Sequence, residues 1–554
     1  MRRLALALAA AAVACPPPPV ETPPPPLVVR PAGAAAAWFP DAFDPDLALS
    51  LVAFLDQRFR EPGNAPYREA LDELESRLRR AGFGERPGLL LERWTLVESA
   101  PTWEPLAATL EVVAPEPAPL LSFVSGADRE RTMLLIGSPG TDGPLEAELQ
   151  EEGQGDPKGR ALLARGVPEE SYARLARELP AFVLFRADAR WEGPVSRDDA
   201  IPFANVPTLE RGPPAVRLSR RAESRLRELL DKGASVVLRL DAGVRLDRGP
   251  VEMLHAEVRG GELPGLAFAA HLDEPGAEDN ASGVAVAVGL AELLATGLRR
   301  SVDAPPPNRS LHFLFGPELD HVDEAARRLA PGLGWAVALD QVGRPPGPGR
   351  YGEPTRALVE RSPDPSLRWR ADTGPGSGWL GDGVEAGGSW SGSPAAFLAD
   401  VLVALLRDTG GDWVSHPFEG GSDHVPFLAY DVPSALVWKF PDPTYHTSLD
   451  RLGPGVVDAG ELERVGEAML ALVRSLAWED GALAVGAAAE AARGRLAALA
   501  AEPAGACAWT SWLLAAVDDL SRVLGPLAAA EPAAGTLRTL REELAAGLGA
   551  CPEP

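Results

Sequence analysis

The fold of this chain is decided by the stretch Leu266-Ala-Phe-Ala-Ala-His271-Leu-Asp273-Glu-Pro-Gly-Ala-Glu-Asp279-Asn-Ala-Ser-Gly283. Its first five residues are apolar and predict a buried strand, and the apolar run 284–294 predicts a buried helix. His271 and Asp273 follow the strand directly, at the end where open α/β sheets build their sites. Residues two apart face the same way in an extended backbone, so we expect Asp273 to orient the ring of His271.

Asp279 stands just before the predicted start of the helix. An aspartate in this place is commonly an N-cap, which accepts hydrogen bonds from the first helical turn. A carboxylate at the end of a strand also suits a metal ion. This segment alone leaves both interpretations open.

Acidic residues follow two later predicted strands in the same way. The segment Phe315-Gly-Pro-Glu318 comes directly after the predicted strand 310–315, and Asp340 closes the run 336–339. Glu318 is either a general base, a metal ligand or an exposed loop acid, and Asp340 is either a ligand or a turn residue. The shared position after a strand favours a role in one common site.

Two more clusters flank the predicted strand 434–440, and they hold the residues Asp423, His424, Tyr445, His446 and Asp450. A single histidine is more often a hydrogen-bonded structural residue than a ligand. The recurrence of acids and histidines after successive strands nevertheless favours one site. Oxygen and imidazole donors without thiolates suit a catalytic zinc centre, since structural zinc usually takes several cysteines.

Predicted strands alternate with predicted helices from residue 246 to residue 478, which indicates an α/β fold with a mixed, largely parallel central sheet. Before this region, strands mixed with short helices between 115 and 245 predict a separate β-rich inserted module. The remaining elements predicted from periodicity are helices over 38–83, 219–232, 394–407 and 460–477 and strands over 107–113, 132–136, 181–185 and 235–240. Residues 343–393 are rich in Gly, Pro and Ser and predict a long loop or an insertion, and Ala-rich helices are expected beyond 481.

The 554 residues carry 53 Lys and Arg against 79 Asp and Glu, a net charge of −26. This charge argues against a nucleic-acid partner, which requires a basic surface. It also argues against docking on an anionic membrane through charge.

The N-terminus has the pattern of a bacterial export signal, with Met-Arg-Arg followed by an apolar run that is too short to span a bilayer. Cys15 is the expected lipidation site, and the Pro-rich segment after it predicts a stiff spacer. We therefore expect an exported protein, held in the cell envelope as a lipoprotein, or otherwise periplasmic or extracellular. Membrane contact is expected only through this anchor, and Cys507 and Cys551 are candidates for a disulfide.

In order and context these motifs resemble the zinc aminopeptidase family of clan MH, which includes bacterial leucyl aminopeptidases, glutamate carboxypeptidase and glutaminyl cyclase. The resemblance implies zinc, one ion or two, and a peptide substrate. It implies that His271, Asp279 and Asp340 form one metal site. It further implies that Asp279 bridges to a second site with a Glu and His446, while Asp273 orients His271. Asp423, His424, Tyr445 and Asp450 are then expected to bind substrate or to support the ligands.

The inserted module is similar to the protease-associated domain that many members carry. The resulting domain prediction is a signal peptide over 1–14, a linker over 15–37, a catalytic domain over 38–114 and 246–478, the inserted domain over 115–245 and a helical region over 479–554.

One position departs from the family pattern, which has a Glu pair where this chain has Glu318-Leu319. If Glu318 is the base, the second metal lacks a carboxylate, because Leu319 cannot bind metal. We expect Glu318 to be the base and the second metal to be weak or absent. The predicted function is a zinc-dependent exopeptidase, most simply an aminopeptidase. The alternatives are a non-catalytic binding lipoprotein that keeps the fold, or a glutaminyl cyclase.

Overall fold

The computed structural model describes residues 30–39, 42–124, 129–187, 197–207, 212–301, 304–349, 354–365, 396–501 and 506–548. The predicted signal peptide, Cys15 and most of the Pro-rich linker lie outside these residues. So does most of the predicted 343–393 loop. Cys507 is disulfide-bonded, and its predicted partner Cys551 also lies outside the described residues.

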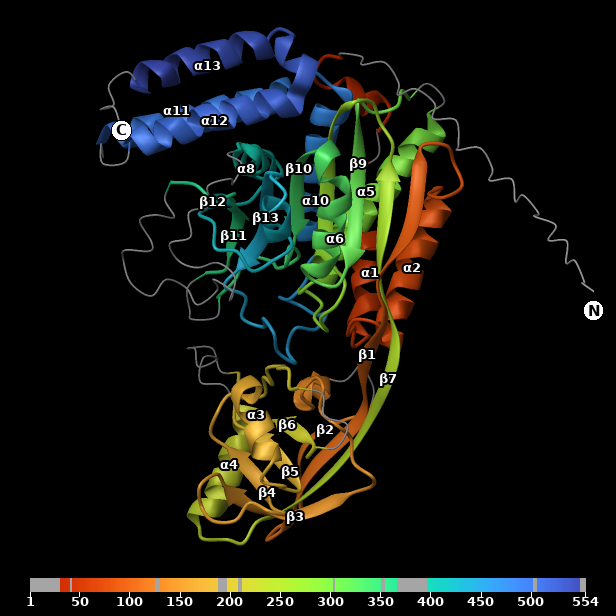
Figure 1. The fold of residues 1–554 in the computed structure, drawn as a ribbon, viewed down its shortest axis with the longest axis vertical. Coiled ribbons are helices and arrows are strands. Elements are labelled where there is room, and N and C mark those ends of the chain that lie inside the picture. The colour runs from red at the N-terminus through yellow and green to blue at the C-terminus, as the bar shows by residue number, and fades with distance from the viewer. Residues whose placement is uncertain are drawn as a thin grey trace, which may run out of the picture.

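The chain forms a large body around a central sheet and a smaller body that hangs below it (Figure 1). A long two-stranded ribbon joins the two bodies. It consists of β1 (Leu89–Ala114) and β7 (Val237–Val258), which pair antiparallel over most of their length.

The central sheet is built around three parallel neighbours, β10 (Leu333–Leu339), β8 (Leu263–His271) and β9 (Arg309–Gly316). On one side β13 (Ser434–Phe440) continues the parallel order next to β10. On the other side β7 runs antiparallel to β9. The predicted α/β class with a mixed, largely parallel sheet is confirmed.

The predicted 343–393 loop contains a strand, β11 (Arg356–Glu360), which pairs antiparallel with β13 and parallel with β12 (Val414–His416). The prediction of a long loop or an insertion did not include this strand. The short apolar run Ala357-Leu-Val359 is too brief to stand out between Gly- and Pro-rich neighbours, but Leu358 and Val359 are buried. Burial against β13 supplies the stability that the local pattern does not show.

Successive side chains along a strand point to opposite faces of the sheet, so the apolar side chains form a separate core on each face. Phe268, Phe313 and Val337 point into the larger core, whereas Ala269 and Leu314 point into the smaller one. The helices that supply the larger core are α1 (Pro45–Asp56), α2 (Ala65–Ala81), α5 (Ala281–Arg300), α8 (Leu398–Asp408) and α10 (Ala459–Val473). The smaller core lies under α6 (Asp320–Leu329) and α9 (Val425–Leu428).

By length and composition alone, α5 could cross a membrane, but most of it is buried inside the fold. It is therefore a core helix of the large body. Three helices near the end of the chain pack across the end of the large body (Figure 1). They are α11 (Ala482–Ala501), α12 (Ala506–Leu524) and α13 (Ala533–Leu548).

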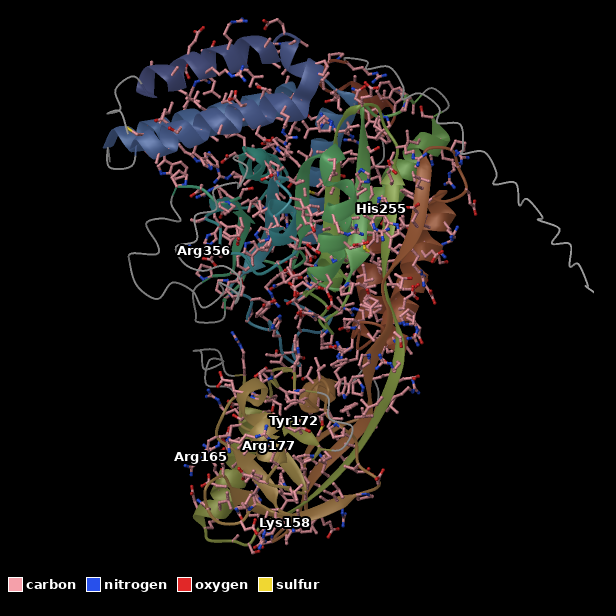
Figure 2. All side chains as sticks on the ribbon, viewed as in Figure 1. Lys158, Arg165, Tyr172, Arg177, His255 and Arg356 are labelled. Atoms are coloured by element: carbon pink, nitrogen blue, oxygen red, sulfur yellow. The ribbon has the colours of Figure 1, made fainter. Side chains whose placement is uncertain are left out.

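The smaller body has its own core and a sheet in which β3 (Leu145–Glu151), β4 (Ala161–Ala164), β5 (Phe182–Phe185) and β6 (Ala215–Arg217) run parallel. Residues Lys158, Arg165, Tyr172 and Arg177 mark its position in Figure 2. The remaining elements are β2 (Ala118–Phe123), α3 (Pro168–Ala176) and α4 (Arg220–Asp231). Its core also includes Trp103 and Leu110 from the ribbon.

The predicted strand 132–136 was wrong. The structure has a 3-10 helix at Arg129–Met133, followed by single bridges at Leu134 and Ile136. The buried Arg131 explains the difference, because its guanidinium donates to the backbone carbonyls of Asp56 and Pro275. This segment docks the smaller body onto the larger one.

Gly283 tests how α5 is seated against β10. A Cβ atom at this position would lie 2.1 Å from the carbonyl oxygen of Leu339, and a backbone atom cannot move aside cheaply. We expect Gly283→Ala to lower the free energy of unfolding by about 1–3 kcal/mol through overpacking. Gly486, in an exposed part of α11, is the control, because nothing lies within 4 Å of its Cβ position. Gly486→Ala should stabilise by about 0.5–1 kcal/mol. Urea denaturation in which both variants shift the midpoint equally would contradict this packing.

Candidate metal centre

Three of the predicted ligands come together at the carboxyl end of the central sheet. His271 is the last residue of β8, and Asp340 follows β10 directly. Asp279 precedes α5, whose N-cap is Asn280, since the Asn280 side chain accepts a hydrogen bond from the Gly283 amide. The capping role is thus taken by the neighbouring residue, and the Asp279 carboxylate is available for the site.

The first donor group consists of His271, Asp279 and Asp340, each of which offers one atom within 4.8 Å of the others. His271 Nε2 lies 3.2 Å from Asp279 Oδ1 and 4.0 Å from Asp340 Oδ1. All three side chains are buried. Nitrogen and carboxylate oxygen atoms at this spacing suit a zinc ion.

A second donor group shares Asp279 with the first and adds Glu274 and His446. His446 Nε2 lies 3.3 Å from Asp279 Oδ2 and 3.4 Å from Glu274 Oε2. The two oxygens of Asp279 therefore face different histidines. The resemblance implied this bridging arrangement, but it did not indicate Glu274.

The donor atoms fit a cation because two of them lack a hydrogen bond. Within the part of the chain that the structure describes, neither Asp340 Oδ1 nor Glu274 Oε2 accepts a hydrogen bond, although both atoms are buried. Buried carboxylate oxygens are normally paired or bound to metal. Each donor group therefore contains one buried carboxylate oxygen without a hydrogen bond.

Asp423, rather than Asp273, holds the ring of His271. His271 Nδ1 lies 3.2 Å from Asp423 Oδ2, on the opposite side of the ring from Asp279. Asp273 instead accepts a hydrogen bond from the Glu318 amide, at 2.8 Å. The prediction for Asp273 assumed an extended backbone beyond His271, but β8 ends at that residue.

Asp450 holds the backbone at Asp279, the ligand that both donor groups share. Its carboxylate accepts hydrogen bonds from the amides of Glu278 and Asp279, at 2.8 and 3.0 Å. Burial raises the pKa of Asp450 to about 8, with a further contribution from Asp442. The predicted supporting role of Asp450 therefore has a geometric basis, and the contact is to backbone.

The other two predicted residues are His424 and Tyr445, and Tyr445 touches a candidate ligand directly. The buried ring of His424 faces Glu360, with Nε2 2.9 Å from Oε1, and Glu360 also accepts the amides of Glu419 and Gly420. This contact holds the loop that carries Asp423. Tyr445 stacks on His446, with ring centroids 3.6 Å apart.

The smaller body contacts the loop that carries His446. The Phe203 amide donates to the His446 carbonyl at 3.1 Å, and the two rings lie 4.6 Å apart. Ile201 exchanges hydrogen bonds with Ser448, and Pro202 forms a single bridge with Thr447. The inserted module thus covers one side of the second donor group.

Burial and neighbouring charged groups together shift the pKa values of the candidate ligands. Burial alone would raise the pKa of Asp279, but hydrogen bonds to His271 and His446 hold it well below its usual value. Burial opposes the charging of His271, yet Asp340, Glu318 and the two aspartate contacts raise its pKa well above normal. Burial and the nearby Asp279 charge raise the pKa of Asp340.

Glu318 and Leu319 occupy the turn between β9 and α6. Glu318 is half-buried, and its charge acts on His271, Glu274 and Asp340, that is, on both donor groups. The Leu319 amide donates to Asp423 Oδ1 at 3.0 Å, and its side chain is more than one-third exposed. Glu318 is therefore placed beside the site, while Leu319 adds only its backbone.

Glu274 is the member of the second donor group that the sequence did not predict. It stands in the quoted stretch between Asp273 and Pro275 and has a left-handed backbone, with φ of 69°. The available signal was an extra carboxylate in a loop that already holds two candidate acids. The direction of its side chain could not be predicted from strand alternation, because β8 ends at His271.

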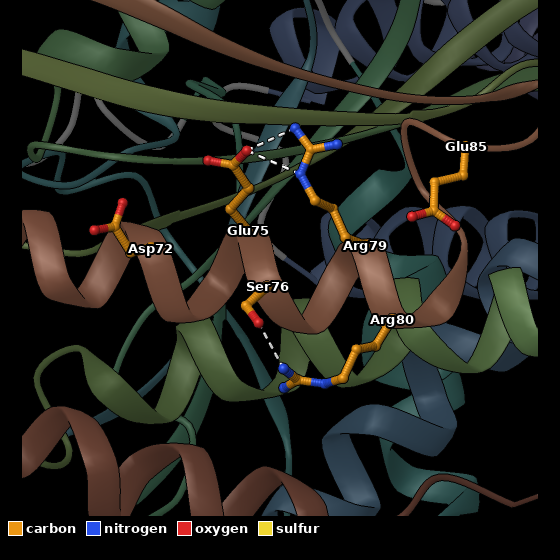
Figure 3. A pocket seen from close by; sticks show the side chains of 6 residues that line it. All are labelled: Asp72, Glu75, Ser76, Arg79, Arg80 and Glu85. Atoms are coloured by element: carbon orange, nitrogen blue, oxygen red, sulfur yellow. Dashed lines mark hydrogen bonds and ion pairs between the residues drawn. The ribbon is translucent and has the colours of Figure 1, made fainter.

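A hollow on the surface of α2 is lined by charged residues and Ser76, and some of these side chains bond to one another (Figure 3). Arg79 donates to Glu75, and Arg80 donates to Ser76. None of its residues belongs to either donor group, and it adds nothing to the centre.

Residues 254–316 match the model of Peptidase family M28. This segment runs from β7 through β8 and α5 to β9, and it contains His271, Glu274 and Asp279. The predicted resemblance to zinc peptidases is thereby confirmed. No curated protein sequence matches the chain.

Among the solved structures compared with this chain, one with a TM-score above 0.5 shares its fold. A Peptidase M28 precursor from Shewanella amazonensis SB2B is 17% identical, with a TM-score of 0.52 over 79% of this chain and 94% of its own. A zinc aminopeptidase from Bacillus subtilis is 17% identical, with a TM-score of 0.49 over 78% and 95%. Glutaminyl cyclase from Porphyromonas gingivalis is 13% identical, with a TM-score of 0.35 over 78% and 97%.

Two histidines outside the donor groups form a buried pair, with His255 Nε2 3.1 Å from His312 Nδ1 (His255 is labelled in Figure 2). Burial lowers the pKa of His255 to about 3, helped by the charges of His312 and Arg328. An unfolded histidine takes up its proton near pH 6.5. The unfolded state therefore binds the proton first, and this contribution to stability is complete above pH 6.5 and is lost as the pH falls towards 3.

The free energy of unfolding should fall less steeply with decreasing pH in His255→Asn than in the unmodified protein. Between pH 6.5 and 4.5 we expect the slope to be smaller by up to about 1.4 kcal/mol per pH unit. Urea unfolding at several pH values measures the slope. An unchanged slope in the His255 variant would contradict the assigned pKa.

Proposed function

We propose that this chain is a zinc-dependent exopeptidase that releases amino acids from the N-terminus of peptides. The observation that carries the proposal is the pair of donor groups joined by Asp279, with Glu318 beside both, in a segment that matches Peptidase family M28. When bound, zinc would lower the pKa of water towards about 7 and polarise the scissile carbonyl. His271, Asp279, Asp340 and His446 are the predicted residues that would hold it.

Glu318 is the proposed general base. Its carboxylate accepts a proton from the attacking water and delivers it to the leaving amine nitrogen. Burial raises the pKa of Glu318 well above normal, and the charges of neighbouring acids add to this effect. A raised pKa suits a group that must both accept and return a proton near neutral pH. Asp273 helps by holding the Glu318 amide.

A cavity next to Asp340 supports an apolar N-terminal side chain as the preferred substrate. Its wall includes the apolar or aromatic side chains of Leu436, Trp438, Phe440 and Tyr445. Polar groups from Gln341, Glu419 and Ser422 complete the wall. Apolar and aromatic side chains with a few polar groups are typical of small-molecule sites. A leucyl substrate is therefore the natural first choice for assay.

The direct test measures release of leucine from a leucyl peptide by the full chain. Chelation should abolish release and added zinc should restore it. Glu318→Gln should lower kcat by about 100- to 10,000-fold, because the proton transfer is lost, while zinc content stays unchanged. Glu324→Gln, on the outer side of α6 and paired with Arg327 and Arg328, is the control and should keep full activity.

Release that survives chelation or Glu318→Gln would contradict the proposal. Ammonia release from a glutaminyl peptide, without free amino acid, would instead indicate the glutaminyl cyclase alternative. Zinc binding without either reaction would favour the non-catalytic alternative.

A further inference from the structure

We propose that Glu274 is a ligand of a second zinc ion and takes the place of the carboxylate that Leu319 cannot supply. This inference rests on the proposed function, because it assigns a residue to the same metal centre. It replaces the expectation that the second metal is weak or absent. Four features of the described residues carry it.

The first feature is the geometry of the second donor group. Glu274 Oε2, His446 Nε2 and an Asp279 oxygen lie within 4.8 Å of one another. Glu274 and Asp279 are mostly buried, with side chains 15% and 4% exposed, whereas His446 is 30% exposed. This leaves one side of the group open to a substrate, as a catalytic metal requires.

The second feature is the incomplete pairing of Glu274 with His446. The two atoms lie 3.4 Å apart, yet Glu274 Oε2 accepts no hydrogen bond from the described residues. His446 Nε2 faces Asp279 Oδ2 at nearly the same distance, 3.3 Å. A single ring N–H cannot satisfy two carboxylates at once, whereas one cation between the three atoms would satisfy all of them.

The third feature is the way the loop is held. Arg60 donates to the carbonyls of Leu272 and Gly276, at 2.7 and 3.0 Å, and Arg131 donates to that of Pro275. Both arginines are fully buried. These contacts hold the loop on either side of Glu274 in a left-handed conformation that a non-glycine residue rarely adopts. Such conformations persist where the surroundings impose them, and they concentrate at functional sites.

The fourth feature is the position of Leu319. Its side chain is 39% exposed and belongs to neither donor group. Leu319 therefore supplies no carboxylate to the second group, and Glu274 is the residue that completes it.

The test counts zinc ions in the full chain after chelation and titration, by calorimetry and by metal analysis. The unmodified protein should bind two ions and Glu274→Gln one, with the affinity for the remaining ion changed less than tenfold. Glu61→Gln is the matched control, because Glu61 is a half-buried glutamate near the same loop that lies outside both groups. Its pKa is raised by burial and by the charges of Asp273 and Glu274. It should still bind two ions.

Two ions in Glu274→Gln, one ion in the unmodified protein, or loss of an ion in Glu61→Gln would each overturn the inference. If Glu274→Gln does not fold, anomalous diffraction from zinc-loaded crystals of the unmodified protein decides the question. A zinc ion about 2.0–2.2 Å from a Glu274 oxygen supports the assignment, and its absence there overturns it. A different result would contradict the proposed peptidase function alone. In that case the zinc-loaded protein would bind two ions but release no amino acid.

Discussion

The carboxylate of Asp279 is the constraint on which the rest of the centre depends. Its Oδ1 faces His271, from the end of β8, and its Oδ2 faces His446, from a loop after β13. A single buried side chain therefore joins two donor groups that come from opposite sides of the site. Any shift of Asp279 would disturb both groups at once.

The surrounding structure holds this carboxylate through its backbone. Asp450 accepts the Asp279 amide, and Asn280 caps α5 and also donates to the Leu339 carbonyl at 2.8 Å. The start of α5 is thus tied to the end of β10, where Asp340 begins the next loop. Close packing at Gly283 allows this approach, since a larger residue there would collide with the same carbonyl.

The centre also concentrates backbone strain. Glu274, Leu319, Gln341 and His446 all have positive φ angles, between 53° and 69°. Each such residue costs about 1–3 kcal/mol, so the fold accepts a sizeable penalty in the loops that surround the site. The buried arginines and carboxylates that bind these loops offset that cost and keep the donor atoms in place before any ligand arrives.

The ligands at strand ends could be predicted from sequence, because their positions follow from the topology of a parallel sheet. His271 and Asp340 are of this kind, and the paired histidine and aspartate motifs added His446. The prediction was less successful where the backbone leaves the strand. Two features of the site depend on turns whose conformation is set by tertiary contacts, including those of Arg60 and Arg131, which are distant in sequence. These features are the position of Glu274 and the contact of His271 with Asp423 instead of Asp273. The strand β11 was missed because its stability comes from pairing with β13.

The measurement that tests the central claim most directly is the zinc content of Asp279→Asn, compared with Asp340→Asn, in the purified and zinc-saturated full chain. If Asp279 joins the two groups, its variant should lose both ions, whereas the Asp340 variant should lose only the ion of the first group. An Asp279 variant that keeps an ion with unchanged affinity would contradict the account.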